Sequence, residues 1–599
     1  MDNFVNLHNH SDYSLLDGFG TVDEYIARAV EMGQPALGLT DHGNVCGLFS
    51  FIQKCNKAGI KPIPGIEAYV APVNPMGAKV HQPVRYGKPG QEGIDVSGNG
   101  AYLHMTLWAM NDEGLHSLYA LVREASMEGN EFNHLDLPDG EGNYYMKPRM
   151  DLDMLARHNA GLIATTGCPS GEIQTRFRLG QDEQAYDYAR RMSEIFEGSY
   201  FVELMDHSMA QGKDIERVSI PKLLKLADDL NLPLLATNDS HYCNHEDAPH
   251  HEEMLCANSK ATMYDLPYDE GGKRFAFNGN EYYLKTRDEM LSIPVFHEHP
   301  EAVDNTMRIA DMVEHIEFKL RSDLRPEVEI PDGYDEIGWF KHEIKEGLKK
   351  KRSDASPEVK AEAVKRINHE LPVFTDNNFV QYMLVVKDYI DWARNNGIRV
   401  GYGRGSVGGS EIAFDLNISD TDPIRHNLMF ERFLNPERLS PPDVDTDFAA
   451  SRRDEVVDYV KDKYGEDHIA NIITFNKFLS KTALADMARI YNIPVFESNK
   501  ATKLIPEIKP NQGASLSDIY DEKSKIYTQA AEFRKLMEEE KWKPVIAAAR
   551  AIEGRIKTTG VHACGIIMSS HPITDAAPMT YKHKPSKPWG SSCCQWTYE

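Results

Sequence analysis

Side chains that bind metals recur in this sequence directly after short apolar segments that have the length of β-strands. Phe4–Leu7 precedes His8 and His10, Ala36–Thr40 precedes His42, Ile63–Ile66 precedes Glu67, Leu162–Thr166 precedes Cys168, and Leu234–Thr237 precedes Asp239 and His241. Apolar segments of helical periodicity, such as Val22–Met32 and Pro221–Leu230, lie between several of these strands. Alternating strands and helices predict a parallel sheet or barrel.

This arrangement predicts a metal centre. The carboxyl ends of parallel strands meet on one rim, and that rim carries the chemistry of such folds. His8 and His10 are two residues apart, so a strand would point both the same way. Taken singly, a histidine after a strand is commonly a hydrogen-bonded loop residue, Cys168 a small buried side chain, and Asp239 a turn residue. Their recurrence at so many strand ends favours a cluster of divalent metals instead.

A glycine-rich segment marks a second candidate site. Ile398–Gly403 is predicted to be a strand that enters GYGRGSVGGS, residues 401–410, before Glu411–Leu416. Small residues let a backbone approach a phosphate. The segment is not a Walker A loop, because no Gly-Lys-Ser/Thr ends it. A simple tight turn is the alternative.

Three aspartates follow this segment in PPDVDTDF. Asp443, Asp445 and Asp447 alternate with other residues, so in a strand their carboxylates would point the same way. Like charges at this spacing repel unless a cation lies between them. Two Mg²⁺ ions, as in phosphoryl transfer, would meet that need. An acidic loop is the alternative, and the spacing does not say which two aspartates bind.

Composition describes an ordinary globular protein. The 599 residues suffice for three or more domains, with 26% charged and 41% hydrophobic residues. The sequence shows no signal peptide, no apolar run of membrane-spanning length and no CxxC pair, so we expect a cytoplasmic protein without a membrane partner. The net charge of −26 alone argues against nucleic-acid binding. Local fields decide such binding, however, and bound cations would offset part of the acidity.

Several motifs resemble one known family. NLHNHSDYSLLDG, GLTDHGN, GIEAY, YLHMTLWA, TTGCPSGE and ATNDSHY resemble the PHP (polymerase and histidinol phosphatase) domain of bacterial C-family DNA polymerase III alpha subunits. GYGRGSVGGS, FERFLNPER and PPDVDTDF resemble the palm of the same polymerases. The resemblance implies a multidomain α/β fold: a PHP-type β/α barrel, then a mixed α/β palm and a helical thumb. It divides the chain into residues 1–285 (PHP domain), 286–474 (palm), 475–553 (thumb) and 554–599 (return to the palm and start of the fingers).

The resemblance also assigns roles to residues. It implies a PHP metal site of nine positions: His8, His10, Asp17, His42, Glu67, His104, Cys168, Asp239 and His241. His104 joins the set only through the resemblance, because it begins its apolar run, Leu103–Ala109, instead of following it. In the palm it implies that Asp443 and Asp445 are catalytic, with Asp447 as support. The residues implied to bind the incoming nucleotide are Arg404, Gly405, Ser406 and Arg432. For Arg438 a structural ion pair is an equal alternative.

The implied function is that of the N-terminal part of a replicative polymerase. It combines DNA-directed synthesis by two-metal nucleotidyl transfer with a PHP 3′→5′ proofreading exonuclease. The implied cofactors are Mg²⁺ in the palm and two or three Mn²⁺ or Zn²⁺ ions in the PHP domain. The implied partners are primer–template DNA, deoxynucleoside triphosphates, a C-terminal polymerase portion and, through that portion, the sliding clamp and other replisome subunits.

Two other functional classes are weighed against this one. A stand-alone metallo-phosphoesterase with a vestigial palm is disfavoured by the intact FERFLNPER and PPDVDTDF motifs. A non-catalytic scaffold that presents the PHP surface to replication proteins is disfavoured by the intact set of ligand residues.

The end of the sequence carries one further expectation. The family places a third palm aspartate and a nearby lysine shortly after the region of Gln595, and the sequence ends at Glu599 before either. We expect a split gene, an interrupted reading frame or a truncated sequence. We also expect nuclease activity without templated synthesis until a second chain supplies that aspartate, the lysine and the fingers.

Overall fold

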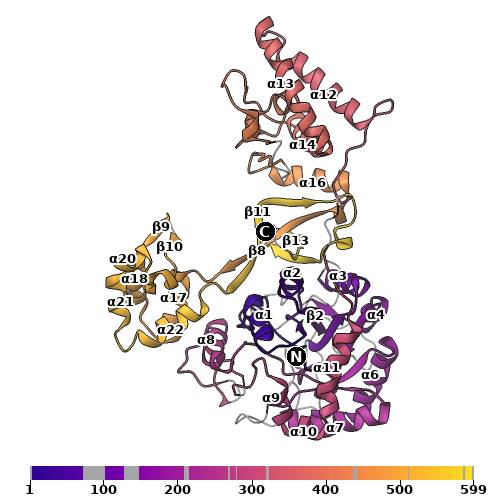
Figure 1. Ribbon diagram of the computed structural model, residues 1–599, viewed down its shortest axis with the longest axis vertical. Coiled ribbons are helices and arrows are strands. Elements are labelled where there is room, and N and C mark those ends of the chain that lie inside the picture. The colour runs from indigo at the N-terminus through magenta and orange to yellow at the C-terminus, as the bar shows by residue number, and fades with distance from the viewer. Residues whose placement is uncertain are drawn as a thin grey trace. The chain divides into compact units, whose positions relative to one another are not determined.

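The chain forms two compact units (Figure 1). The first comprises Met1–Lys319, Asn471–Gly565 and Ala576–Glu599, and the second comprises Leu320–Ala470 and Ile566–Asp575. The computed structural model describes residues 3–71, 102–126, 148–207, 215–267, 270–277, 279–318, 321, 323–435, 442–509, 512–584 and 587–596.

The first unit is built around a seven-stranded sheet with the order β1-β2-β3-β5-β6-β7, in which β4 pairs with β2. Its strands are almost entirely buried because their residues are mostly apolar. They are β1 (Ala36–Leu39), β2 (Lys61–Val70), β3 (Leu103–Ala109), β4 (Arg149–Met150), β5 (Leu162–Thr165), β6 (Tyr200–Leu204) and β7 (Leu234–Ala236).

Helices lie around the outside of these strands (Figure 1). They are α1 (Val22–Glu31), α2 (Leu48–Ala58), α3 (Asp112–Ser126), α4 (Leu152–Arg157), α5 (Glu172–Arg178), α6 (Asp182–Ile195), α7 (Ile215–Leu230), α8 (Ala248–Asn258), α9 (Arg287–Ser292), α10 (Pro294–Glu298) and α11 (Pro300–Met312). The amphipathic α1 buries Val22, Tyr25, Ile26 and Ala29, and Thr21 and Glu24 form a capping box at its start. None of the described helices is both long and apolar enough to cross a membrane.

The N-terminal segment joins the two edges of this sheet. On one side, the backbone N–H of Gly38 in β1 donates to the carbonyl oxygen of Asn6. On the other side, His10 donates to the carbonyl of Ser240, and Ser240 donates to the carbonyl of His8. Because Ser240 follows β7, the segment closes the sheet into a barrel and carries His8 and His10 to its rim. This mixed α/β barrel confirms the predicted fold class of the first unit.

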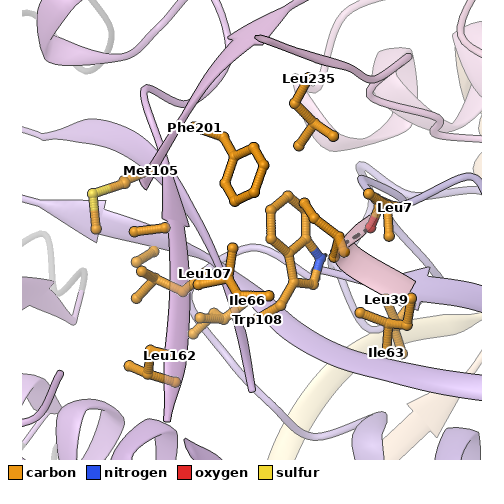
Figure 2. Packing of buried hydrophobic residues seen from close by; sticks show 14 of the residues in the cluster. Leu7, Leu39, Ile63, Ile66, Met105, Leu107, Trp108, Leu162, Phe201 and Leu235 are labelled. Carbon is orange, nitrogen blue, oxygen red and sulfur yellow. Dashed lines mark hydrogen bonds between the residues drawn. The ribbon is translucent and has the colours of Figure 1, made fainter. Parts of the chain in front are cut away.

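The interior of the barrel is filled by apolar side chains around Trp108 of β3. The indole is fully buried, and its N–H donates to the carbonyl oxygen of Leu7 at 3.2 Å. Figure 2 shows Phe201 of β6 beside the ring, with the hydrogen bond to Leu7 drawn as a dashed line. The N-terminal segment is therefore anchored to the barrel interior as well as to its edges.

The direction of β3 corrects the predicted parallel sheet. Pairings β1–β2, β5–β6 and β6–β7 are parallel, but β3 runs antiparallel to β2 and to β5. Its first residues therefore lie on the rim where the parallel strands end. This explains why His104 reaches that rim although it stands at the start of its apolar run.

The core of the barrel extends beyond residue 285, where we expected the first domain to end. Met290 of α9, Phe296 of α10 and Ile309 of α11 are buried in the same apolar cluster as the strands. The compact first unit accordingly continues to Lys319.

Residues 480–552 of the first unit are mainly helical. The helices are α17 (Ser480–Ile490), α18 (Val495–Lys503), α19 (Leu516–Tyr520), α20 (Lys525–Gln529), α21 (Ala531–Met537) and α22 (Lys543–Ile552), with a short pair of strands, β9 (Glu507–Lys509) and β10 (Gln512–Gly513). They share one apolar cluster with Met254 and Cys256 of α8. Arg489 of α17 donates to the carbonyl oxygens of Ala257 and Ala261 at 3.0 Å.

A four-stranded sheet, most of whose residues belong to the first unit, has the order β11-β8-β13-β12. Its strands are β8 (Ile469–Lys477), β11 (Ile556–Met568), β12 (Met579–Lys584) and β13 (Lys587–Cys594). β13 is parallel to β8 and antiparallel to β12.

The second unit packs helices around its own apolar core. They are α12 (Glu336–Lys351), α13 (Pro357–Asp376), α14 (Val380–Asn395), α15 (Glu411–Asp415), α16 (Arg453–Tyr464) and the single turns η4 (Val407–Gly409) and η5 (Phe430–Arg432). Phe340, Phe374, Met383 and Ile412 meet in this core.

The predicted strands of the second unit are wrong in detail. Ile398–Gly403 and the aspartate segment pair only through the isolated bridges Val400↔Phe448 and Arg404↔Asp445. Gly403 and Gly405 have φ of +95° and +81°, and this left-handed backbone interrupts an extended strand.

Candidate functional site

Histidines and carboxylates converge on the rim of the barrel. His8 and His10 come from the N-terminal segment, and their Nε2 atoms lie 3.1 Å apart. Asp239, from the loop after β7, places Oδ1 3.0 Å from His10 Nε2. His42, from the loop after β1, lies 3.1 Å from the Asp17 carboxylate.

Glu67 of β2 connects this group to the other side of the rim. Its carboxylate contacts His42 Nδ1 and lies 3.1 Å from Nδ1 of His104, which stands on β3. Cys168, in the loop after β5, has Sγ 3.5 Å from the same nitrogen of His104.

The cluster contains three overlapping groups whose ligand atoms lie within 4.8 Å of one another: His10, His42 and His241; His8, His10 and Asp239; and His42, Glu67 and His104. Asp17 adjoins them through His42, and Cys168 through His104. The structure therefore brings together all nine residues that the sequence analysis assigned to the metal site.

The residues of this cluster fit divalent cations. Six buried atoms in it meet no complete hydrogen-bond geometry within the described part of the chain, although other members of the cluster lie within 4.0 Å of them: Asp17 Oδ1, His42 Nδ1, Glu67 Oε1 and Oε2, Asp239 Oδ1 and His241 Nε2. Buried polar atoms are costly unless they are paired or bind a metal. Their convergence is what a set of metal ligands requires, and imidazole, carboxylate and thiol are the appropriate donors.

Protons on two histidines offset the buried carboxylates. Burial would lower the pKa of His42, but Glu67 and Asp17 raise it to about 10. Burial likewise opposes protonation of His8, yet Asp239 and Glu203 hold its pKa well above the usual value. These protons supply positive charge that bound cations would supply instead, so cation binding would release them.

The pKa values of two further members of the cluster are shifted by burial and by neighbouring charges. Burial, with repulsion from His42 and His241, lowers the pKa of His10 to about 3. Burial, followed by the charges of Glu67 and Asp239, raises the pKa of the Cys168 thiol. Cys168 therefore becomes an anionic ligand only when a cation is present to favour the thiolate.

The structure adds residues that the sequence analysis missed. Glu203 of β6 is buried, and Oε1 lies 2.8 Å from His8 Nδ1. Its sequence signal is a single carboxylate inside the apolar run Tyr200–Met205. Ser14 Oγ lies 3.2 Å from His10 Nδ1 and donates to Asp41 at 2.7 Å. No spacing pattern singles out Ser14.

In the second unit, the glycine-rich segment lies beside the aspartates. Arg404 pairs with Asp445 at 3.1 Å and approaches Asp447 at 3.7 Å. Gly401 N–H donates to the carbonyl of Asp447 at 2.8 Å. A Cβ on Gly405 would lie 3.7 Å from the Asp445 carboxylate. The guanidinium of Arg404 thus faces two of the three aspartates.

The other residues predicted for this site are less enclosed. Asp443 is exposed, and Ser406 directly precedes η4. Arg432 ends η5 and is exposed. Arg438 lies outside the described residues. The second site is therefore open, in contrast to the buried cluster of the first unit.

Helix α15, which follows the glycine-rich segment, is fixed by a buried carboxylate. Glu370 of α13 accepts hydrogen bonds from Ser410 Oγ at 2.7 Å, Glu411 N–H at 2.9 Å and Ile412 N–H at 3.1 Å. Arg352, at the end of α12, pairs with Glu411 of α15 at 2.7 Å. These contacts determine where the chain leaves the glycine-rich segment.

Comparison with known proteins identifies two matching families. Residues 6–207 match the PHP domain, and residues 338–599 match the Bacterial DNA polymerase III alpha NTPase domain. Curated relatives of this chain bear the name DNA polymerase III subunit alpha. The one from Mycobacterium tuberculosis is 42% identical and covers 96% of this chain and 46% of the relative. The relative from Saccharopolyspora erythraea is 42% identical, and the match covers 97% of this chain and 47% of the relative. The relative from Borreliella burgdorferi is 35% identical, and the match covers 100% of this chain and 47% of the relative. The chain spans about half the length of the curated relatives it matches.

Glu370→Gln tests the buried carboxylate at α15. Burial raises the pKa of Glu370 from 4.5 to about 7, so between these values the folded protein holds a proton that the unfolded chain releases. This contribution to the free energy of unfolding is present below about pH 4.5 and falls as the pH rises to about 7. In urea unfolding at several pH values, we expect wild type to lose stability relative to Glu370→Gln over this range and then to stay constant.

The control is Glu362→Gln, a partly exposed position on the same helix, which should show no such trend. An equal difference between wild type and Glu370→Gln at about pH 5 and about pH 8 would contradict the assignment.

Proposed function

Because this chain belongs to the family of bacterial DNA polymerase III alpha subunits, we propose that it forms the N-terminal part of a replicative DNA polymerase. We propose further that its PHP domain removes nucleotides from the 3′ end of DNA. The observation that carries the nuclease proposal is the convergence of nine ligand residues on one rim, with six buried atoms that meet no complete hydrogen-bond geometry within the described residues.

The donor set favours Mn²⁺ or Zn²⁺ as the cations of the PHP domain. Imidazoles and a thiol are softer ligands than the all-oxygen sites that Mg²⁺ prefers. Divalent cations, when bound, supply positive charge that stabilises the phosphoryl oxygens during hydrolysis of a phosphodiester. The imidazoles of His8, His10 and His241 and the carboxylates of Glu67 and Asp239 would hold them.

Exposure indicates from which side DNA reaches this site. The side chains of His8, His10 and Glu67 are almost fully buried, whereas that of Asp17 is 27% exposed. The side chains of His42, His104 and Asp239 lie between these extremes, at 13%, 14% and 15% exposed. A terminal phosphodiester therefore approaches from the side of Asp17 and His42. These residues are placed to orient the substrate, while the buried ones fix the cations.

In the second unit, Asp443 and Asp445 would hold Mg²⁺ for nucleotidyl transfer, and Arg404, Gly405, Ser406 and Arg432 would contact the nucleotide triphosphate. The ion pair between Arg404 and Asp445 supports this proposal, because a guanidinium suits phosphate groups and this one lies against one of the two carboxylates proposed to hold Mg²⁺. Mg²⁺ at the carboxylate would free Arg404 to bind the triphosphate. Primer–template DNA, deoxynucleoside triphosphates, the remaining portion of the polymerase fold and, through it, the sliding clamp are the proposed partners.

Metal content tests the first centre. We expect purified wild type to retain two or three Mn²⁺ or Zn²⁺ ions per chain, measured by inductively coupled plasma mass spectrometry. The double variant His8→Ala, His10→Ala lacks two buried imidazoles and should not retain the metal ions. The control His116→Ala, His297→Ala changes two exposed histidines of the same unit and should keep them. A folded wild type that binds neither metal would refute the proposed centre.

Digestion of a 5′-labelled DNA strand tests the nuclease. We expect wild type to shorten the strand from its 3′ end, and Asp17→Asn and Asp239→Asn to be slower by at least about 10²-fold, because a misplaced catalytic group has such a cost. Asp23→Asn, at a largely exposed position on α1, is the control and should match wild type. Equal digestion by all variants would assign the activity to a contaminant or to another site.

Primer extension tests the second site. Because the chain spans about half the length of its relatives, we would mix it with the second half of the Mycobacterium tuberculosis relative. We expect template-directed synthesis that Asp445→Asn lowers by at least about 10²-fold, since an ion without its carboxylate is misplaced. Asp462→Asn, exposed on α16, is the control. Unchanged synthesis by Asp445→Asn would remove that residue from the catalytic site.

A further inference from the structure

Glu203 is a buried carboxylate inside the barrel. It stands on β6, where side chains alternate in direction, so it points to the same side as Phe201 two residues earlier. Phe201 lies in the apolar interior beside Trp108 (Figure 2). Glu203 therefore occupies the layer between that interior and the metal-ligand rim, and it is only 1% exposed.

Three hydroxyl groups from three other parts of the barrel surround this carboxylate. Thr237, after β7, donates to Oε1 at 2.7 Å. Thr106 of β3 donates to Oε2 at 3.1 Å, and Thr165 of β5 donates to the same oxygen. Because each hydroxyl has only one proton to give, the arrangement suits an ionised carboxylate that accepts from all three.

The fourth partner of the Glu203 carboxylate is His8. Oε1 lies 2.8 Å from Nδ1, and both side chains are fully buried. An ionised carboxylate only accepts, so Nδ1 of His8 must carry a proton. The other nitrogen, Nε2, faces the cluster, 3.4 Å from Asp239 and 3.5 Å from Glu67.

We propose that Glu203 is a positioning residue of the metal centre: its carboxylate holds the Nδ1–H of His8 and thereby presents the lone pair of Nε2 to a cation. This inference rests on the proposed metal centre and adds a residue outside its nine ligands. A carboxylate behind a ligating histidine fixes the tautomer and the ring direction and makes the imidazole a stronger ligand.

Two neighbouring histidines have their outer nitrogens occupied in the same way. His10 Nδ1 contacts Ser14 Oγ at 3.2 Å, and His241 Nδ1 contacts the carbonyl oxygen of Asp239 at 2.8 Å. In each case Nε2 is left for the centre. His8 alone among these three has a charged partner, so the effect of removing that partner should be larger at His8.

The test measures the affinity of the full chain for Zn²⁺ by competition with a chromophoric chelator. Glu203→Gln keeps the size of the side chain but replaces one acceptor oxygen with an amide NH₂. We expect it to weaken Zn²⁺ binding by about 10- to 100-fold. Glu172→Gln, a buried carboxylate of the same unit paired with Arg176, is the matched control and should bind as wild type does.

A double-mutant cycle separates positioning from a general effect on the fold. If Glu203 acts through His8, then Glu203→Gln has no further effect on Zn²⁺ affinity in a His8→Ala background. It keeps its full effect in a His104→Ala background. A merely structural role would give the same loss in both backgrounds and would overturn the proposal.

Thr237→Val is the second variant in case Glu203→Gln does not fold. It removes the hydroxyl that shares Oε1 with His8 but keeps the carboxylate, so we expect a smaller loss of affinity, again only where His8 is present. If every folded variant of this pair binds Zn²⁺ with wild-type affinity, the role of Glu203 is refuted but the proposed metal centre is not. A wild type that binds no Zn²⁺ or Mn²⁺ would refute the proposed centre and this inference together.

Discussion

The closure of the barrel by residues 6–10 is the interaction on which the metal-ligand cluster depends. Hydrogen bonds to Gly38 on one side and Ser240 on the other hold the segment between the first and last strands of the sheet. The Trp108 indole fixes it from within through Leu7. His8 and His10 reach the rim because of these bonds. The functional residues at the start of the chain are therefore placed by elements that come later in the sequence.

Charge explains why the two sites are built differently. In the first, carboxylates and histidines are buried together, and the carboxylates raise the pKa of His42 to about 10 and that of His8 well above its usual value. Such a site is already arranged for cations. In the second, Asp445 is 44% exposed and Asp447 is 60% exposed, and both face Arg404. Exposure to solvent and the guanidinium of Arg404 offset these charges, so the second site is open where the first is enclosed.

The sequence predicted most of the first site because its geometry follows from a local rule. A residue directly after a buried parallel strand lies on the rim where such strands end, and this rule placed His42, Cys168 and Asp239 correctly. Glu67 lies on the rim for another reason, because β2 does not end at Ile66 as predicted but continues to Val70. His104 lies on the same rim from the start of its strand, because β3 runs antiparallel to its neighbours. The sequence did not predict this, since strand direction is set by pairing with distant residues. Glu203 was missed because its role depends on hydroxyls from β3, β5 and the end of β7. The predicted strand at Ile398–Gly403 was wrong because Gly403 and Gly405 adopt left-handed backbone conformations.

The loop that carries Asp17 shows how far the first site depends on residues remote in sequence. The guanidinium of Arg555 lies 3.6 Å from the ring centroid of Phe19 and pairs with Glu24 at 2.8 Å. The next residue, Ile556, donates its N–H to Asp12 at 3.2 Å. Both contacts hold the segment between His10 and α1, and Arg555 is almost fully buried. Since Asp17 lies within that segment, its direction toward His42 is determined partly by the strand that begins at Ile556. The first site is thus a property of the whole first unit, and the barrel residues alone do not define it.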